Sequence, residues 1–137
     1  MNATPTAMPV QTSDTWRQLQ RHWHCYADET GLNEPLDYNR PEHTVAATPD
    51  EVLAWLAAET DRLLPRVSAR WQAEADRLTT DEALRAVHRA TLQRGKGTGA
   101  TIRLADVRVV MLLAIPAGPE IDDPGILSAQ VCARHGS

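Results

Sequence analysis

Residues 101–116 read TIRLADVRVVMLLAIP, and the fold class depends on whether this stretch is helical or extended. Valine, isoleucine and leucine dominate it, and a continuous apolar run fits a buried helix as well as a buried strand. We expect Thr101 to Leu104 to be extended and Asp106 to Ala114 to form a buried helix that Pro116 ends. A single strand over the whole stretch is the alternative.

The segment just before this stretch is rich in glycine. Residues 95–99 read GKGTG, but they lack the G-x-x-x-x-G-K-[ST] order of a P-loop. We interpret them as a flexible connector whose glycines permit a positive φ. Upstream, Thr79-Thr80-Asp81-Glu82 carries helix-capping residues and predicts a helix from about Asp81 to Arg94.

The clearest helix start in the chain is Thr48-Pro49-Asp50-Glu51, a capping box with proline at the first helical position. Apolar residues then follow at helical spacing along one face: Val52, Leu56, Leu63, Val67 and Trp71. Pro65 removes a backbone donor inside this pattern, so we expect a kink or a break there. The apolar positions continue in phase beyond it, which favours a kink.

The N-terminal third carries a second helical stripe. Ser13 provides an N-cap, and apolar residues at helical spacing predict a helix from residue 13 to about Thr30, ended by Gly31: Trp16, Leu19, Trp23 and Tyr26. Residues 1–12 are expected to be a mobile tail, and residues 31–47 a long polar loop. A last short helix is expected from Asp123-Pro124, with Leu127 and Val131 facing inward.

Together these elements predict a small all-α fold. The 137 residues match the usual size of one domain, so we expect residues 13–137 to form a single domain of four to five helices. At most one or two short strands are expected near residues 100–105. The N-terminus does not resemble a secretory signal, and no apolar run approaches the length of a membrane span. These features predict a cytoplasmic protein with two free thiols and no membrane partner.

Charge is distributed unevenly along the chain. Residues 62–108 carry nine arginines and the only lysine against five acids, whereas the whole chain has a net charge of −4. Two predicted helices and the Gly-rich loop carry the basic side chains expected to form one face: Arg62, Arg66, Arg70, Arg85, Arg89 and Lys96. Trp55 lies at or near the rim of this face, where tryptophan is typical of binding sites. Pairing with acids of the same chain is the alternative.

The basic face predicts a non-enzymatic interaction or regulatory module. Its partner would be another protein, including a second copy of the chain in a homodimer. No nucleophile, base and orienting group stand in a recognisable catalytic arrangement, so no catalytic residue is assigned. An accessory subunit of an enzyme remains a third interpretation.

A DNA-binding regulator is the alternative from a different class. Residues 79–104 combine an arginine-rich helix, a basic Gly-rich loop and an extended segment. Glu82-Ala83-Leu84-Arg85 followed by Gly95-Lys96-Gly97-Thr98 resembles the recognition helix and wing of GntR-type repressors, although the segment between helix and wing is several residues short. The resemblance implies that Arg85 and Arg89 face the major groove and that Arg94, Lys96 and Arg103 contact phosphates.

Cysteine and histidine suggest a metal site. His22-x-x-Cys25 and Cys132-x-x-His135 each place two ligand types at i, i+3, which is one side of a helix. Together the pairs would supply a Cys₂His₂ zinc set, and the protein would be a small zinc-stapled domain. Two unrelated pairs that bind no metal are the alternative.

Overall fold

The fold combines helices with an antiparallel sheet. In the computed structural model, described over residues 15–31, 43–119 and 130–131, the elements are α2 (Thr15–Gln18), β1 (His22–Gly31), β2 (Thr44–Ala46), α3 (Pro49–Leu63), the 3₁₀ turns η1 (Leu64–Arg66) and η2 (Ala69–Trp71), α4 (Gln72–Thr80), α5 (Glu82–Gln93), β3 (Thr98–Ala105), β4 (Arg108–Gly118) and β5 (Gln130–Val131). The predicted all-α class is therefore wrong, and the protein is an α+β protein.

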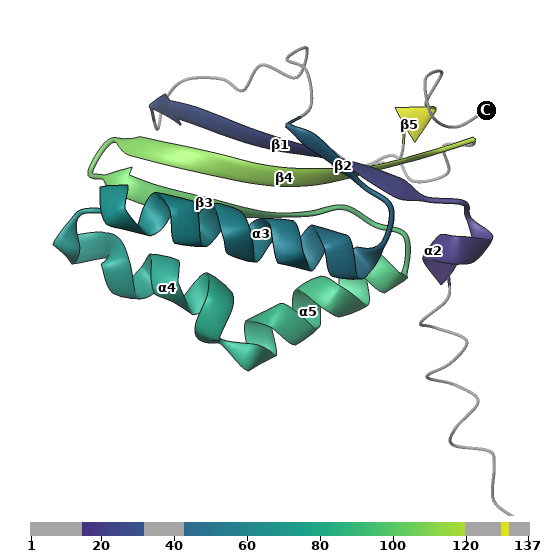
Figure 1. Cartoon of the computed structure of the whole chain (residues 1–137), viewed down its shortest axis with the longest axis horizontal. Coiled ribbons are helices and arrows are strands. Elements are labelled where there is room, and N and C mark those ends of the chain that lie inside the picture. The colour runs from purple at the N-terminus through teal and green to yellow at the C-terminus, as the bar shows by residue number, and fades with distance from the viewer. Residues whose placement is uncertain (1–14, 32–42, 120–129, 132–137) are drawn as a thin grey trace, which may run out of the picture.

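The sheet has the order β2-β1-β4-β3, with every neighbouring pair antiparallel. The short strand β5 pairs in parallel with the end of β4. Helices α3, α4 and α5 form one layer against the sheet (Figure 1). The three helices lie between β1 and β4 in the sequence. The two strands nevertheless pair directly with each other in the sheet.

The stretch that we expected to contain a helix at 106–114 is instead the turn before β4 and most of β4 itself. Both faces of this strand are covered. Val110, Leu112 and Ala114 belong to the core shared with the helices, and Val109 and Ile115 are also buried. A strand buried on both faces has no polar alternation, so its sequence cannot be told from a buried helix by period alone.

The predicted helix over residues 13–30 is also wrong beyond its first turn. Helix α2 ends at Gln18, and residues 22–31 form β1. Trp23 and Cys25 are fully buried on the helix side, and Ala27 packs partly against the same core. Trp23, Cys25 and Ala27 recur at every second position, as expected for a strand. The helical spacing of the neighbouring aromatic residues obscured this alternation in the sequence.

Helix starts were predicted well because capping is local. The side chain of Thr48 accepts a hydrogen bond from the Glu51 backbone N–H at 3.1 Å, and Asp81 accepts one from Leu84 N–H at 3.1 Å. Pro65 does not kink the helix as favoured above. Helix α3 ends at Leu63, and the chain continues through η1 and η2 before α4 begins.

The Gly-rich segment connects α5 to β3 and caps the helix. Gly95 has a φ of +82°, and its N–H donates to the Leu92 carbonyl at 2.8 Å. The Lys96 N–H donates to the Thr91 carbonyl at 3.2 Å, which completes a C-terminal cap. The Lys96 carbonyl then accepts a hydrogen bond from the Trp23 indole at 3.0 Å, so this connector is fixed to the central strand.

Several expected features lie outside the described residues: the N-terminal tail at 1–12, most of the polar loop at 31–47 and the start of the last helix at Asp123. Within that loop Thr44–Ala46 forms β2, and Val131, expected in the last helix, belongs to β5. Across the described ranges no helix combines the length and apolar character needed to cross a bilayer.

Candidate interaction surface

Most of the predicted basic face is paired with carboxylates of the same chain. Arg62 contacts Glu59 at 2.7 Å, Arg66 contacts Glu29 at 2.8 Å, and Arg70 lies 3.6 Å from Asp106. Arg89 forms an ion pair with Asp50. The six residues do not form one continuous row, because α3 ends before Arg66 and Arg70 and because α5 follows a separate helix.

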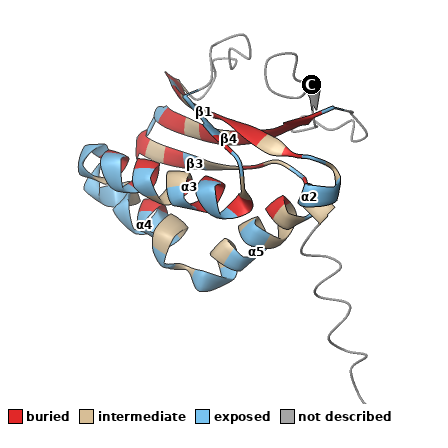
Figure 2. Ribbon diagram, turned by 45° about the vertical axis from the view of Figure 1, so that its right-hand side comes forward, coloured by how far each residue is buried: buried red, intermediate tan, exposed pale blue. Residues whose placement is uncertain are grey.

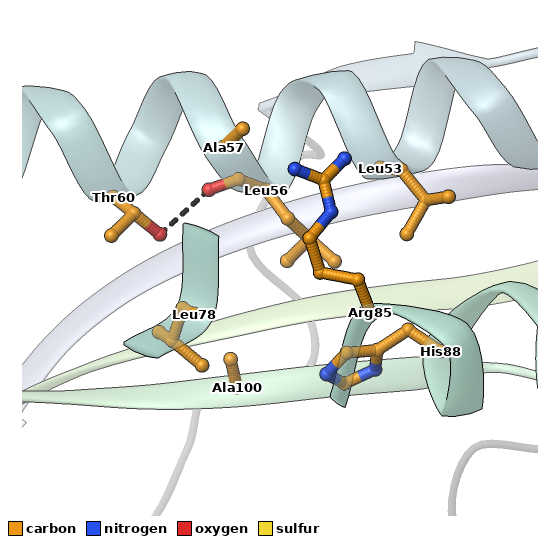
Figure 3. A pocket seen from close by; sticks show the side chains of 8 residues that line it. All are labelled: Leu53, Leu56, Ala57, Thr60, Leu78, Arg85, His88 and Ala100. Atoms are coloured by element: carbon orange, nitrogen blue, oxygen red, sulfur yellow. Dashed lines mark hydrogen bonds between the residues drawn. The ribbon is translucent and has the colours of Figure 1, made fainter. Parts of the chain in front are cut away.

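Arg85 faces inward, contrary to the exposed row expected on α5. It lines a narrow cavity between α3, α4, α5 and β3, together with His88, Leu78, Ala100 and four residues of α3 (Figure 3). The cavity volume is about 10 Å³, room for roughly one water molecule. His88 Nδ1 lies 2.6 Å from Thr98 Oγ1, and burial lowers the pKa of His88. This site is too small for an organic ligand.

Trp55 and Lys96, both expected in the basic face, lie in different parts of the structure. The Trp55 indole donates to Nδ1 of His43 at 3.1 Å, beside the Glu59–Arg62 pair. Lys96 is exposed in the capping turn after α5. Arg85, Arg89 and Lys96 therefore do not form the outward surface that the resemblance to a recognition helix and wing implies.

The richest cluster of arginines lies where the β3–β4 hairpin meets η2. The guanidinium carbons of Arg70 and Arg103 lie 5.0 and 4.3 Å from the centre of the Trp71 ring, within cation–π range. The Trp71 indole donates to Asp106 Oδ1 at 3.3 Å. Val107, at the tip of the hairpin, is 69% exposed.

A second group of charges stands at the same end of the sheet. Glu29, near the end of β1, accepts hydrogen bonds from Arg66 at 2.8 Å and from Arg108 at 3.3 Å. The hydrogen bond from Arg66 is the main cause that lowers the pKa of Glu29, and Arg108 adds to it. One carboxylate thus accepts hydrogen bonds from two arginines.

We call these residues the hairpin-end cluster: Glu29, Arg66, Arg70, Trp71, Arg103, Asp106, Val107 and Arg108. Among the residues that the structure describes, four guanidinium groups meet two carboxylates, so positive charge is in excess there. By contrast, Arg62, Arg77 and Arg89 each pair with a separate carboxylate. Figure 2 shows how exposed residues line the outer faces of α4 and α5 while the strands are largely buried.

Sequence reasoning singled out three members of this cluster: Arg66 and Arg70 in the basic face, and Arg103 as a phosphate contact implied by the resemblance to GntR-type repressors. It placed Trp71 in the core and gave Arg108 no role. No spacing rule could have joined them, because residues 66–71 and 103–108 meet only through packing of η2 on the hairpin, where Ser68 N–H donates to the Leu104 carbonyl at 2.9 Å.

The proposed zinc ligands are not brought together by the described residues. In a strand, positions i and i+3 point to opposite faces, so His22 and Cys25 diverge. Cys25 is fully buried in the core, and burial raises its thiol pKa to about 12, which opposes metal binding. Cys132 and His135 lie outside the described residues. Within the described ranges no group of three or more potential ligands is placed to hold a metal.

Comparison with known proteins adds no relative: no protein-family model, no curated protein and no solved structure matches the chain.

Proposed function

We propose that the protein is a cytoplasmic, non-enzymatic interaction module that binds an acidic segment of a partner protein through the hairpin-end cluster. The observation that carries the proposal is the excess of arginine around Trp71. Two guanidinium groups lie against its ring, and within the described part of the chain one carboxylate, that of Asp106, contacts the trio of Arg70, Trp71 and Arg103.

Exposure supports a contact role for this cluster. The side chain of Arg70 is 72% exposed, and those of Arg66 and Arg108 are about half exposed. Tryptophan and arginine are the residues most enriched at the energetic centres of protein interfaces. Val107 adds an exposed apolar contact beside them.

Charge favours an acidic protein segment over nucleic acid. The whole chain carries a net charge of −4, which repels a long polyanion at a distance. A duplex requires many phosphate contacts spread along its backbone, whereas the cluster offers four arginines that are partly neutralised. A short acidic peptide needs only a local excess of positive charge.

Anisotropy with two labelled probes tests the proposal at low and physiological salt. One probe is a peptide in which glutamate alternates with serine and leucine, and the other is single-stranded DNA of equal formal charge. We expect the peptide to bind more tightly than the DNA. Arg70→Ala combined with Arg103→Ala should weaken peptide binding about fivefold or more, since each arginine contributes up to about 1 kcal/mol.

The matched control is Arg77→Ala combined with Arg89→Ala, which changes the net charge equally but removes arginines that are paired one to one. This variant should bind the peptide nearly as well as the unmodified protein. Equal loss in both double variants, or absence of peptide binding at low salt, would contradict the proposal. Tighter binding of the DNA would favour the regulator alternative instead.

A further inference from the structure

His22 and His24 project from the same face of β1, opposite to the buried Trp23 and Cys25, because side chains alternate along a strand. Their Nε2 atoms lie 3.2 Å apart, and their ring centres are 5.1 Å apart. His24 is only 6% exposed, whereas His22 is half-buried. Two imidazole nitrogens therefore lie close together, and His22 is the more exposed of the two residues.

The separation of the two nitrogens matches that of two ligands on one tetrahedral ion. With Zn–N bonds of about 2.05 Å, two tetrahedral ligands have nitrogens about 3.3 Å apart, whereas adjacent ligands in a square plane are about 2.9 Å apart. The observed 3.2 Å is the length of the hydrogen bond that joins the two rings, and it is compatible with two ligands of one tetrahedral ion. A metal ion would replace the single proton that the two Nε2 atoms share in their hydrogen bond.

The backbone holds this pair rigidly. His24 is paired with Ile115 of β4 on one side and with Val45 of β2 on the other, and His22 is paired with Ala117. His24 has strand neighbours on both sides and His22 on one, so the backbone that carries the two side chains is held in place. Little ordering would then be required when an ion binds, and preorganised ligands bind metals more tightly.

We propose that His22 and His24 bind one Zn²⁺ ion through their Nε2 atoms, with water in the remaining coordination positions. Imidazole is a preferred zinc ligand, and neither nitrogen needs the thiolate that Cys25 cannot readily supply. The pair replaces the His22–Cys25 pair expected from the sequence. The described residues supply two ligands to this site, which is independent of the hairpin-end cluster.

The experiment titrates ZnCl₂ into the full chain, freed of metal beforehand, in competition with a chromophoric chelator. We expect one zinc ion per chain. His22→Gln should weaken binding at least about tenfold, since one of the two protein ligands is lost. His43→Gln is the matched control, because this histidine contacts Trp55 near α3 and lies outside the pair. It should leave zinc affinity unchanged.

Imidazole NMR signals provide the readout that depends on the ligands themselves. Zinc should shift the resonances of His22 and His24 but not those of His43 or His88. His22→Gln is used in preference to His24→Gln because its half-buried position makes unfolding less of a risk, and circular dichroism checks the fold. Equal zinc affinity of the native protein and His22→Gln would overturn the proposal. So would zinc binding that is lost in Cys132→Ser while the two histidine signals do not move.

Discussion

The indole nitrogen of Trp71 donates a hydrogen bond to Asp106 Oδ1 at 3.3 Å, and the same oxygen lies 3.6 Å from Arg70 Nη1. Asp106 stands in the turn between β3 and β4, whereas Trp71 ends η2. One carboxylate therefore joins the tip of the sheet to the helical layer. The Ser68–Leu104 backbone hydrogen bond strengthens the same junction.

Trp71→Phe should lower the free energy of unfolding by about 1 kcal/mol, because a phenyl ring keeps an aromatic group at this position but cannot donate the hydrogen bond to Asp106. Urea unfolding followed by circular dichroism measures the change. Asp106→Asn is the control, since it keeps an oxygen acceptor for the indole and removes only the charge. A Trp71→Phe protein as stable as the unmodified one would show that this hydrogen bond contributes nothing.

Gly95→Ala should destabilise the protein by about 1–2 kcal/mol. The φ of +82° is unfavourable for a residue with a Cβ, and that Cβ would lie 3.1 Å from Leu19 Cδ1. Thermal and urea unfolding report the loss. Gly97→Ala is the matched control, because Gly95 is the one described glycine with a positive φ. If the two alanine variants lose the same stability, the strained cap is not the cause.

Acid should destabilise the protein through Glu29 and Asp81. Hydrogen bonds from Arg66 lower the pKa of Glu29 below its ordinary 4.5, and the Leu84 N–H, followed by Arg77, lowers that of Asp81 below 3.8. A carboxyl whose pKa is lower in the folded state stabilises the protein above its unfolded-state pKa. That contribution is lost as the pH falls through 4.5 and 3.8 toward the lowered folded-state values.

Urea unfolding at a series of pH values tests this dependence. Glu29→Gln combined with Asp81→Asn should flatten the fall in stability below about pH 5. Asp61→Asn is the control, because Asp61 makes no hydrogen bond or ion pair in the described part of the chain. An unchanged pH slope in the double variant would exclude these two carboxylates as the source.

Cys25 should be chemically inert in the folded protein. Its thiol is fully buried with a pKa of about 12, so only about one molecule in ten thousand carries a thiolate at pH 8. In a Cys132→Ser variant, which retains only Cys25, iodoacetamide should react no faster than the protein opens. The same variant in urea is the control and should react at once. Rapid labelling without urea would place Cys25 outside the core.

Local signals in the sequence predicted the helical layer. The caps at Thr48 and Asp81 and the terminating Gly95 depend only on residues within one turn, so their chemistry is readable without the rest of the fold. The expected extended segment Thr101–Leu104 lies within β3. The strands β1 and β4 were not predicted, because their stability depends on partners. β1 and β4 bury residues on both faces, and each pairs with a segment distant in sequence.

Prediction of the interaction surface was limited in the same way, because packing brings its residues together from segments distant in sequence. Arg66 and Arg70 could be selected from their charge and spacing, but Arg103, Asp106 and Arg108 join them only because the hairpin packs beside η2. The convergence of His22 and His24 was missed for a different reason. A helix would turn neighbouring side chains away from a common point, whereas a strand aligns positions i and i+2.

The pairing of β1 with β4 has a consequence for how the chain reaches its folded state. His22 lies opposite Ala117 and Gly31 opposite Arg108, so the centre of the sheet joins the earliest described strand to one of the latest. Contacts this distant in sequence slow folding, because a long loop must close before they form. During synthesis, β1 leaves the ribosome long before its partner exists. Until Arg108–Gly118 emerges, Trp23 and Cys25 have no completed core to enter, and the nascent chain exposes these two side chains to chaperones.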